Sequence, residues 1–188
     1  MARPRSEDKR NAILAAATDL VAEQGLGAAT AEIAKRAGVP HGSIFTYFGT
    51  KAELLNALYL ELKSELTDTV SVAMPAGDDI RVQFHHLWVS WTHWGASNPA
   101  KRRALTQLSV SDQITELSRK AAYEAAGSSL ELIKRASASG ALRGAPLQYV
   151  GAFVETSAAV TMDFMIRDPA RADDFCDFGF EAVWRALS

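Results

Sequence analysis

Apolar residues recur along the chain with the period of an α-helix. The first apolar stripe, within residues 7–25, consists of Ile13, Leu14, Ala17, Leu20 and Val21. These positions follow the pattern i, i+1, i+4, i+7 and i+8, so they share one face of a helix. A second stripe, built from leucines, runs through residues 51–70. Alternation of apolar and polar residues, the sign of a strand, is almost absent. The pattern predicts an all-α protein of about nine helices.

Proline and glycine divide the predicted helices. The clearest break is "MPAGDD" at residues 74–79, whose two acids suit the start of the next helix. Residues 1–51 carry a surplus of two positive charges, whereas the remaining 137 residues carry a deficit of four. We therefore predict a basic three-helix domain over residues 1–51 and a second helical domain over 52–188. Two apolar helices, at about 146–167 and 171–187, are expected to end the chain.

Composition excludes several classes of protein. The chain has 188 residues and a formal net charge of −2, which argues against a generally basic nucleic-acid coat protein. Its one cysteine, Cys176, allows neither an intramolecular disulfide nor a metal site built on thiolates. The start, "MARPRSEDKR", is too charged for a signal peptide, and no apolar run approaches a membrane span. We expect a soluble, cytoplasmic protein with no membrane partner.

Residues 30–48 have the pattern of a helix-turn-helix. Thr30 is a candidate N-cap for the first helix, and Ala34 is small enough for two helices to cross there. Gly38 can adopt the left-handed conformation that reverses the chain within a few residues. Pro40 suits the first turn of the second helix because it lacks an N–H. A turn of this kind also occurs in ordinary helical bundles. However, a bundle helix does not need Gly42 in its interior, which costs about 1 kcal/mol relative to alanine.

The exposed side of the second helix and its flanks carry the predicted DNA contacts. These are Arg3, Arg5, His41, Gly42, Ser43, Thr46, Tyr47 and Lys51. Backbone N–H groups at the start of a helix attract phosphate, and Gly42 has no side chain to hold the backbone away from a ligand. Lys51 can neutralise a phosphate, and Arg3 and Arg5 can reach the backbone or the minor groove.

The stretch "TAEIAKRAGVPHGSIFTYFGTKAELL", at residues 30–55, closely resembles the DNA-binding domain of the tetracycline-repressor (TetR) family of bacterial transcription regulators. The matching positions are Thr30, Ile33-Ala34, Ala37-Gly38-Val39, Gly42-Ser43, Phe45, Tyr47-Phe48 and Lys51. The resemblance covers the first third of the chain. The length of the chain and its all-α C-terminal part also fit this family, although the C-terminal part carries no family motif.

The resemblance implies a role for each matching residue. Thr30 would cap its helix and touch a phosphate, and His41, Gly42 and Ser43 would approach bases. Thr46 would reach a base or the backbone, whereas Tyr47 and Lys51 would hold phosphates. Ile44 and Phe48 would be packing residues. Phe45 stands where many relatives have tyrosine, so it has no hydroxyl to offer a phosphate; packing on the sugar–phosphate backbone is the role left open to it.

In this family the later helices form a ligand chamber, and the last two pair with a second subunit. Phe84, Trp88, Trp91 and Trp94 recur at spacings of four, three and three residues. Such a stripe suits core packing as well as a ligand pocket. Our predicted contacts with a largely apolar or aromatic effector are Phe84, Trp88, Trp91 and Met162. Broad apolar arcs on the last two helices need cover on two sides. The predicted dimer contacts are Phe153, Met165, Phe175 and Phe178.

Together these features predict a homodimeric, ligand-responsive regulator, a repressor released from a palindromic double-stranded DNA operator by a small molecule. Two alternatives remain open: a small helical enzyme that uses His85, His86 and His93, or a helical protein-interaction adaptor. No acidic residue or cysteine joins these histidines with metal-ligand spacing. We therefore expect no metal, no cofactor and no catalytic residue.

Overall fold

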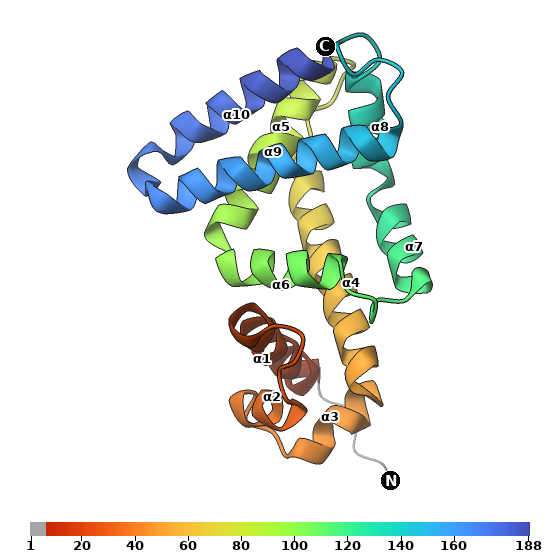
Figure 1. Cartoon of the computed structure of the whole chain (residues 1–188), viewed down its shortest axis with the longest axis vertical. Coiled ribbons are helices and arrows are strands. Elements are labelled where there is room, and N and C mark those ends of the chain that lie inside the picture. Colours follow the sequence, from red (N-terminus) through yellow and green to blue (C-terminus); the bar gives the residue numbers. More distant parts are fainter. Residues whose placement is uncertain (1–6) are drawn as a thin grey trace. The chain divides into compact units, whose positions relative to one another are not determined.

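The structure is a computed structural model that describes residues 7–188, and within this range it is helical with no strand (Figure 1). The α-helices are α1 (Glu7–Gln24), α2 (Thr30–Arg36), α3 (His41–Phe48), α4 (Lys51–Ser71), α5 (Ile80–Ser97), α6 (Pro99–Ser109), α7 (Glu116–Ala125), α8 (Gly127–Ala136), α9 (Leu147–Arg167) and α10 (Ala172–Leu187). A short 3-10 helix, η1 (Pro169–Arg171), precedes α10. The all-α prediction is confirmed. There is one α-helix more than the predicted nine, because the segment near 111–138 forms both α7 and α8.

The chain forms two compact units, and each is built from two separate stretches of sequence. Among the described residues, the first unit comprises residues 7–64 and 99–122, and the second comprises residues 65–98 and 123–188. Helix α4 begins in the first unit and ends in the second. The predicted boundary after residue 51 separates a DNA-binding domain from an effector-binding domain. The division into compact units does not test it, so it remains a prediction. Between residues 7 and 188, no helix combines the length and apolar character that crossing a bilayer requires.

In the first unit, α1 supplies the surface on which α2 and α6 pack. All five residues of its predicted apolar stripe are buried. Gly25 follows the helix with φ +82°, as expected for a residue that ends an α-helix. Helix α6 is tied to this end of α1, since the side-chain amide of Gln107 donates to the carbonyl of Val21 (3.1 Å). The first unit therefore includes a helix that lies far from the helix-turn-helix in sequence.

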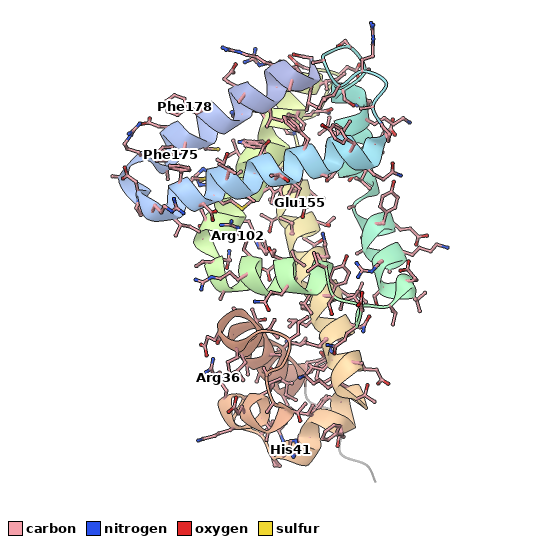
Figure 2. All side chains as sticks on the ribbon, in the orientation of Figure 1. Arg36, His41, Arg102, Glu155, Phe175 and Phe178 are labelled. Atoms are coloured by element: carbon pink, nitrogen blue, oxygen red, sulfur yellow. The ribbon has the colours of Figure 1, made fainter. Side chains whose placement is uncertain are left out.

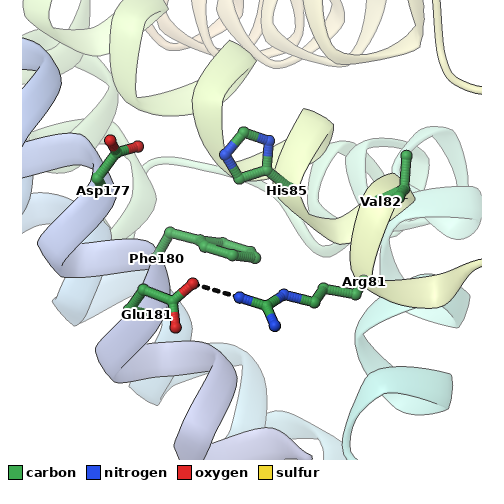
Figure 3. Close-up of a pocket in the computed structure, with 6 residues that line it drawn as sticks. All are labelled: Arg81, Val82, His85, Asp177, Phe180 and Glu181. Carbon is green, nitrogen blue, oxygen red and sulfur yellow. Dashed lines mark hydrogen bonds and ion pairs between the residues drawn. The ribbon is translucent and has the colours of Figure 1, made fainter.

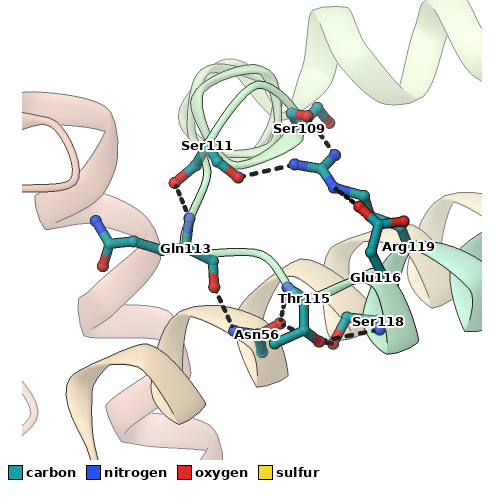
Figure 4. A network of polar contacts seen from close by, with 8 residues as sticks. All are labelled: Asn56, Ser109, Ser111, Gln113, Thr115, Glu116, Ser118 and Arg119. Carbon is teal, nitrogen blue, oxygen red and sulfur yellow. Dashed lines mark hydrogen bonds and ion pairs between the residues drawn. The ribbon is translucent and has the colours of Figure 1, made fainter.

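A polar network fixes the loop between α6 and α7 to α4 (Figure 4). The side-chain amide of Asn56 donates to the carbonyl of Gln113 (2.8 Å) and accepts from the amide N–H of Thr115 (2.9 Å). Arg119 of α7 donates to the carbonyl of Ser109 at the end of α6 (2.8 Å). These bonds satisfy loop backbone groups that no regular element would pair. The loop is thus held by side-chain hydrogen bonds together with the buried side chain of Ile114.

In the second unit, α5 packs against α8, α9 and α10. Asp79 caps α5 by accepting from two amide N–H groups, so the acidic start predicted for this helix is confirmed. Phe84 and Trp88 are fully buried, and the indole N–H of Trp88 donates to the carbonyl of Cys176 in α10 (3.0 Å). Gly179 allows this close approach of helices, because a Cβ there would lie 2.7 Å from Trp88 Cζ2.

We predict that Gly179→Ala destabilises the protein by about 1–3 kcal/mol, the usual cost of an extra methyl in a packed site. The added Cβ would press on Trp88 and, closer still, on Thr161 Oγ1, and both residues are buried. Gly151→Ala in α9 is the matched control, since a Cβ there meets no atom within 4 Å. It should be neutral or stabilise by up to about 1 kcal/mol. Urea unfolding at one protein concentration measures both; equal effects would contradict the close packing at Gly179.

Candidate nucleic-acid interface

The turn between α2 and α3 reverses the chain through one left-handed residue. Gly38 has φ +66°, a backbone conformation that residues with a Cβ rarely adopt. Its amide N–H donates to the carbonyl of Lys35 (3.2 Å), and the N–H of Val39 donates to the carbonyl of Ala34 (3.0 Å). This is the Schellman arrangement, which pairs the last carbonyls of α2. Helix α3 then begins at His41, with Pro40 as its N-cap instead of in its first turn.

One side of α3 is buried in the first unit. Ile44 is fully buried and Phe48 nearly so, as the sequence predicted, and Ile33 and Ala34 of α2 are buried with them. The guanidinium carbon of Arg10 in α1 lies 5.9 Å from the centre of the Phe48 ring. These apolar contacts fix the rotation of α3 about its own axis.

The opposite side of α3 is exposed and centres on Gly42. His41, Gly42, Phe45 and Thr46 are all exposed, and Figure 2 shows His41 at the surface. Because successive helical residues are rotated by about 100°, Phe45 lies about 60° to one side of Gly42 and Thr46 about 40° to the other. A Cβ at Gly42 would meet no atom within 4 Å. Nothing within the described chain therefore requires glycine at this position.

The prediction that Thr30 caps α2 is wrong. The N-cap is Ala29, which makes no side-chain capping bond, and Thr30 is the first helical residue. Thr30 Oγ1 instead lies 3.0 Å from Nε2 of His41, so this hydrogen bond joins the starts of α2 and α3. The His41 ring in turn meets the Phe45 ring edge-on, with centroids 5.3 Å apart. The sequence does not predict this series of contacts. Thr30 and His41 are eleven residues apart, and no local pattern links them.

The remaining predicted DNA contacts lie around the same helix. The Thr46 hydroxyl donates to the carbonyl of Gly42 (3.1 Å) within α3. Ser43 and Tyr47 are half-buried, as is Lys51 at the start of α4. Arg3 and Arg5 lie outside the described residues. The structure thus places the predicted residues of α3 on a continuous surface, with Tyr47 and Lys51 toward its C-terminal end.

An exposed ion pair connects α1 to α2. Both terminal nitrogens of Arg36 donate to the carboxylate of Glu23, at 2.7 and 2.8 Å. The hydrogen bonds from Arg36, more than its charge alone, lower the pKa of Glu23 below its ordinary value of 4.5. The same bonds raise the pKa of Arg36.

The four predicted effector contacts belong to the second unit. Phe84, Trp88 and Met162 are buried in its core, and Trp91 packs against that core half-buried. Core neighbours therefore occupy the surfaces that an effector would touch in this conformation. Their role in binding an effector remains a prediction.

A hollow of about 430 Å³ lies between α5 and α10, and none of these four residues lines it (Figure 3). Its lining consists of Arg81, Val82, His85, Asp177, Phe180 and Glu181. Arg81 pairs with Glu181, and its guanidinium carbon lies 5.6 Å from the centre of the Phe180 ring. Three of these six residues are charged and four are exposed, unlike the lining of an apolar effector site.

The predicted dimer contacts differ in exposure. Phe178 is 62% exposed on α10 (Figure 2), whereas Met165 is 2% exposed and packs in the chain's own core. Phe153 and Phe175 are half-buried. The Phe175 ring lies 5.4 Å from that of Phe164, which is exposed on α9. A dimer contact through any of these residues remains a prediction.

The three histidines considered for catalysis face different partners. His85 meets the Phe180 ring edge-on, with centroids 4.6 Å apart, and His86 Nε2 lies 3.1 Å from the carbonyl oxygen of Val70. His93 Nε2 lies 3.6 Å from a carboxylate oxygen of Asp173. Among residues 7–188, no three side chains of His, Cys, Asp or Glu are grouped to hold a metal ion.

Known proteins resemble this chain both in the helix-turn-helix segment and in the whole fold. The profile described as "Bacterial regulatory proteins, tetR family" matches residues 13–58. An HTH-type transcriptional repressor of Mycobacterium tuberculosis is 44% identical over 71 residues, which cover 37% of this chain and only 38% of that relative. A tetR family transcription regulator from Shewanella is 28% identical, with a TM-score of 0.84 over 95% of this chain and 97% of that one. A further one, from Marinobacter aquaeolei, shares the fold at 22% identity and a TM-score of 0.81, over 99% and 98% of the two chains.

The fold and the exposed face of α3 define a helix-turn-helix protein with a helical C-terminal part. The profile match identifies residues 13–58 as a TetR-family segment, and the full-length structural likeness shows that the whole chain has the fold of a TetR-family transcription regulator.

We predict that Arg36→Gln raises the pKa of Glu23 toward its ordinary value, because it removes the hydrogen bonds to the carboxylate. The pair stabilises the fold above the unfolded pKa of Glu23, and this contribution is lost as the pH falls through the lower folded pKa. A carboxyl NMR titration of Glu23 measures the change. Lys35→Gln, on the same helix, removes an equal charge and is the control. An unchanged Glu23 pKa in Arg36→Gln would contradict the assignment.

Proposed function

We propose that this protein is a homodimeric, sequence-specific DNA-binding regulator that represses transcription from a palindromic operator until a small, largely apolar or aromatic effector releases it. The observation that carries the proposal is the exposed face of α3 centred on Gly42. This face is rotated outward by the burial of Ile44 and Phe48, and its central residue has no packing reason to be glycine.

Helix α3 would enter the major groove with its N-terminal turn nearest the bases. His41 and Ser43 stand at that turn, where base-edge contacts of a recognition helix begin. The hydrogen bond to Thr30 engages Nε2 of His41, so Nδ1 is the nitrogen that we assign to DNA. Tyr47 and Lys51 would donate to phosphates and hold the register of the helix. Arg3 and Arg5 would add contacts to the backbone or the minor groove.

A second copy of the chain would cover the apolar side chains exposed on α9 and α10. Val160, Phe164 and Phe178 are each more than 40% exposed, which supports a partner of apolar character on these helices. In a symmetric dimer, two α3 helices read half-sites about one helical turn, ~34 Å, apart. The operator is then palindromic, and a DNA-binding role places the protein in the cytoplasm.

The effector would act on the core of the second unit, at the predicted contacts Phe84, Trp88, Trp91 and Met162. Three of these are buried, so binding requires the core to open around the ligand. Opening releases DNA only if the effector prefers the dimer shape whose α3 spacing does not fit the operator. His85, His86 and His93 have separate partners, which argues against one catalytic cluster built from all three.

The proposal is tested by selection from a random DNA library with the full chain. We expect a palindrome to be enriched, with an affinity that falls steeply as salt rises because phosphate contacts release counterions. Tyr47→Ala and Lys51→Ala should weaken binding to all sequences. Ser43→Ala should relax the preference at individual base pairs by ~1–3 kcal/mol each. Failure to enrich any sequence would overturn the proposal.

A further inference from the structure

Phe45 is an aromatic ring exposed on the α3 surface without a packing role that explains it. It is 43% exposed, whereas the other large apolar residues of α3, Ile44 and Phe48, are buried. The burial of those two residues already fixes the helix, so Phe45 is not needed to hold it. If this surface faces DNA, as proposed above, the exposed ring of Phe45 contacts the DNA.

The position of Phe45 directs it toward base edges. It lies about 60° from Gly42, the centre of the exposed arc, and one turn after His41. Since Gly42 has no side chain, the helix can lie deep in the groove, which brings the flanking side chains to the base pairs. At this depth Phe45 would reach into the groove and not only along its rim.

The chemistry of the ring limits what it can read. Phenylalanine offers no hydrogen bond to a phosphate or to the polar groups on base edges. The C5-methyl of thymine is the apolar group that the major groove displays, and contact with it is a known means of direct readout by apolar side chains. Burying one methyl contributes about fourfold in affinity.

The Phe45 ring packs against His41, and His41 is in turn held by Thr30. His41 meets Phe45 edge-on at 5.3 Å, and Thr30 Oγ1 lies 3.0 Å from Nε2 of His41. Rotation of His41 away from Phe45 would break the hydrogen bond to α2. A ring that is already oriented loses less entropy when it docks against a base.

We propose that Phe45 determines specificity by contacting the C5-methyl of one thymine in each half-site, with Thr30 as a positioning residue that acts through His41. The inference rests on the proposed DNA-binding function and names one base that it reads.

The test replaces each thymine of the selected operator by deoxyuridine, which removes the methyl and keeps the base pair. Fluorescence anisotropy at one salt concentration gives the affinities. For the wild-type protein we expect one position per half-site where the substitution weakens binding about fourfold, and ~15-fold when both half-sites are changed. In Phe45→Ala, binding to the thymine operator weakens, and thymine and deoxyuridine are bound equally at that position.

Three further variants complete the test. Thr30→Val should reduce the discrimination between thymine and deoxyuridine at unchanged stability, and Thr30→Ser, which keeps the hydroxyl, should restore it. Val110→Ala removes another exposed apolar side chain, outside the helix-turn-helix, and should leave the discrimination intact.

The results distinguish a failure of the Phe45 inference from a failure of the proposed DNA-binding function. An operator that is bound specifically but shows no methyl-sensitive thymine, or one whose sensitivity persists in Phe45→Ala, overturns the inference alone. Failure to enrich any operator overturns the proposed function and this inference together.

Discussion

The burial of one side of α3 is the constraint on which the rest of the site depends. Ile44 and Phe48 lie in the core of the first unit, and the left-handed turn at Gly38 delivers α3 to that core within a few residues. A helix has only one rotation that buries both positions, so the opposite arc is exposed by necessity. The identity of the residues on that arc is then free to serve recognition, because packing does not decide it.

The exposed arc combines features that serve different purposes. Gly42 at its centre costs helix stability and leaves open space beside the backbone, whereas Phe45 and Thr46 flank it with an apolar and a polar side chain. Thr30 links this arc to α2 through His41, so the surface is held by a side-chain bond as well as by the core. The Asn56 network and the bond from Gln107 to Val21 join α6 and the first parts of α4 and α7 within the first unit. Segments distant in sequence thus contribute to the frame of the helix-turn-helix.

The sequence predicted the local features well. The apolar stripe of α1, the burial of Ile44 and Phe48, and the ends of most helices follow from periodicity and from glycine, proline and acidic signals. The contacts between distant residues could not be predicted, because the bond between Thr30 and His41 depends on tertiary packing. The same limit applies to Met165, a predicted dimer contact: it is buried in its own chain, and its contact with a second subunit remains a prediction. A broad apolar arc predicts that this face of a helix is buried, but it does not identify the segment or subunit that buries it.

The central claim is that Gly42 is glycine because DNA approaches its backbone, and Gly42→Ala tests it most directly. The free energy of unfolding and the affinity for the selected operator should be measured on the same preparation. Because a Cβ there meets no atom of the chain within 4 Å, stability should stay the same or rise by up to about 1 kcal/mol. Operator affinity should nevertheless fall by about tenfold or more, since the methyl holds the helix away from the bases. An affinity equal to that of the wild type would contradict the account.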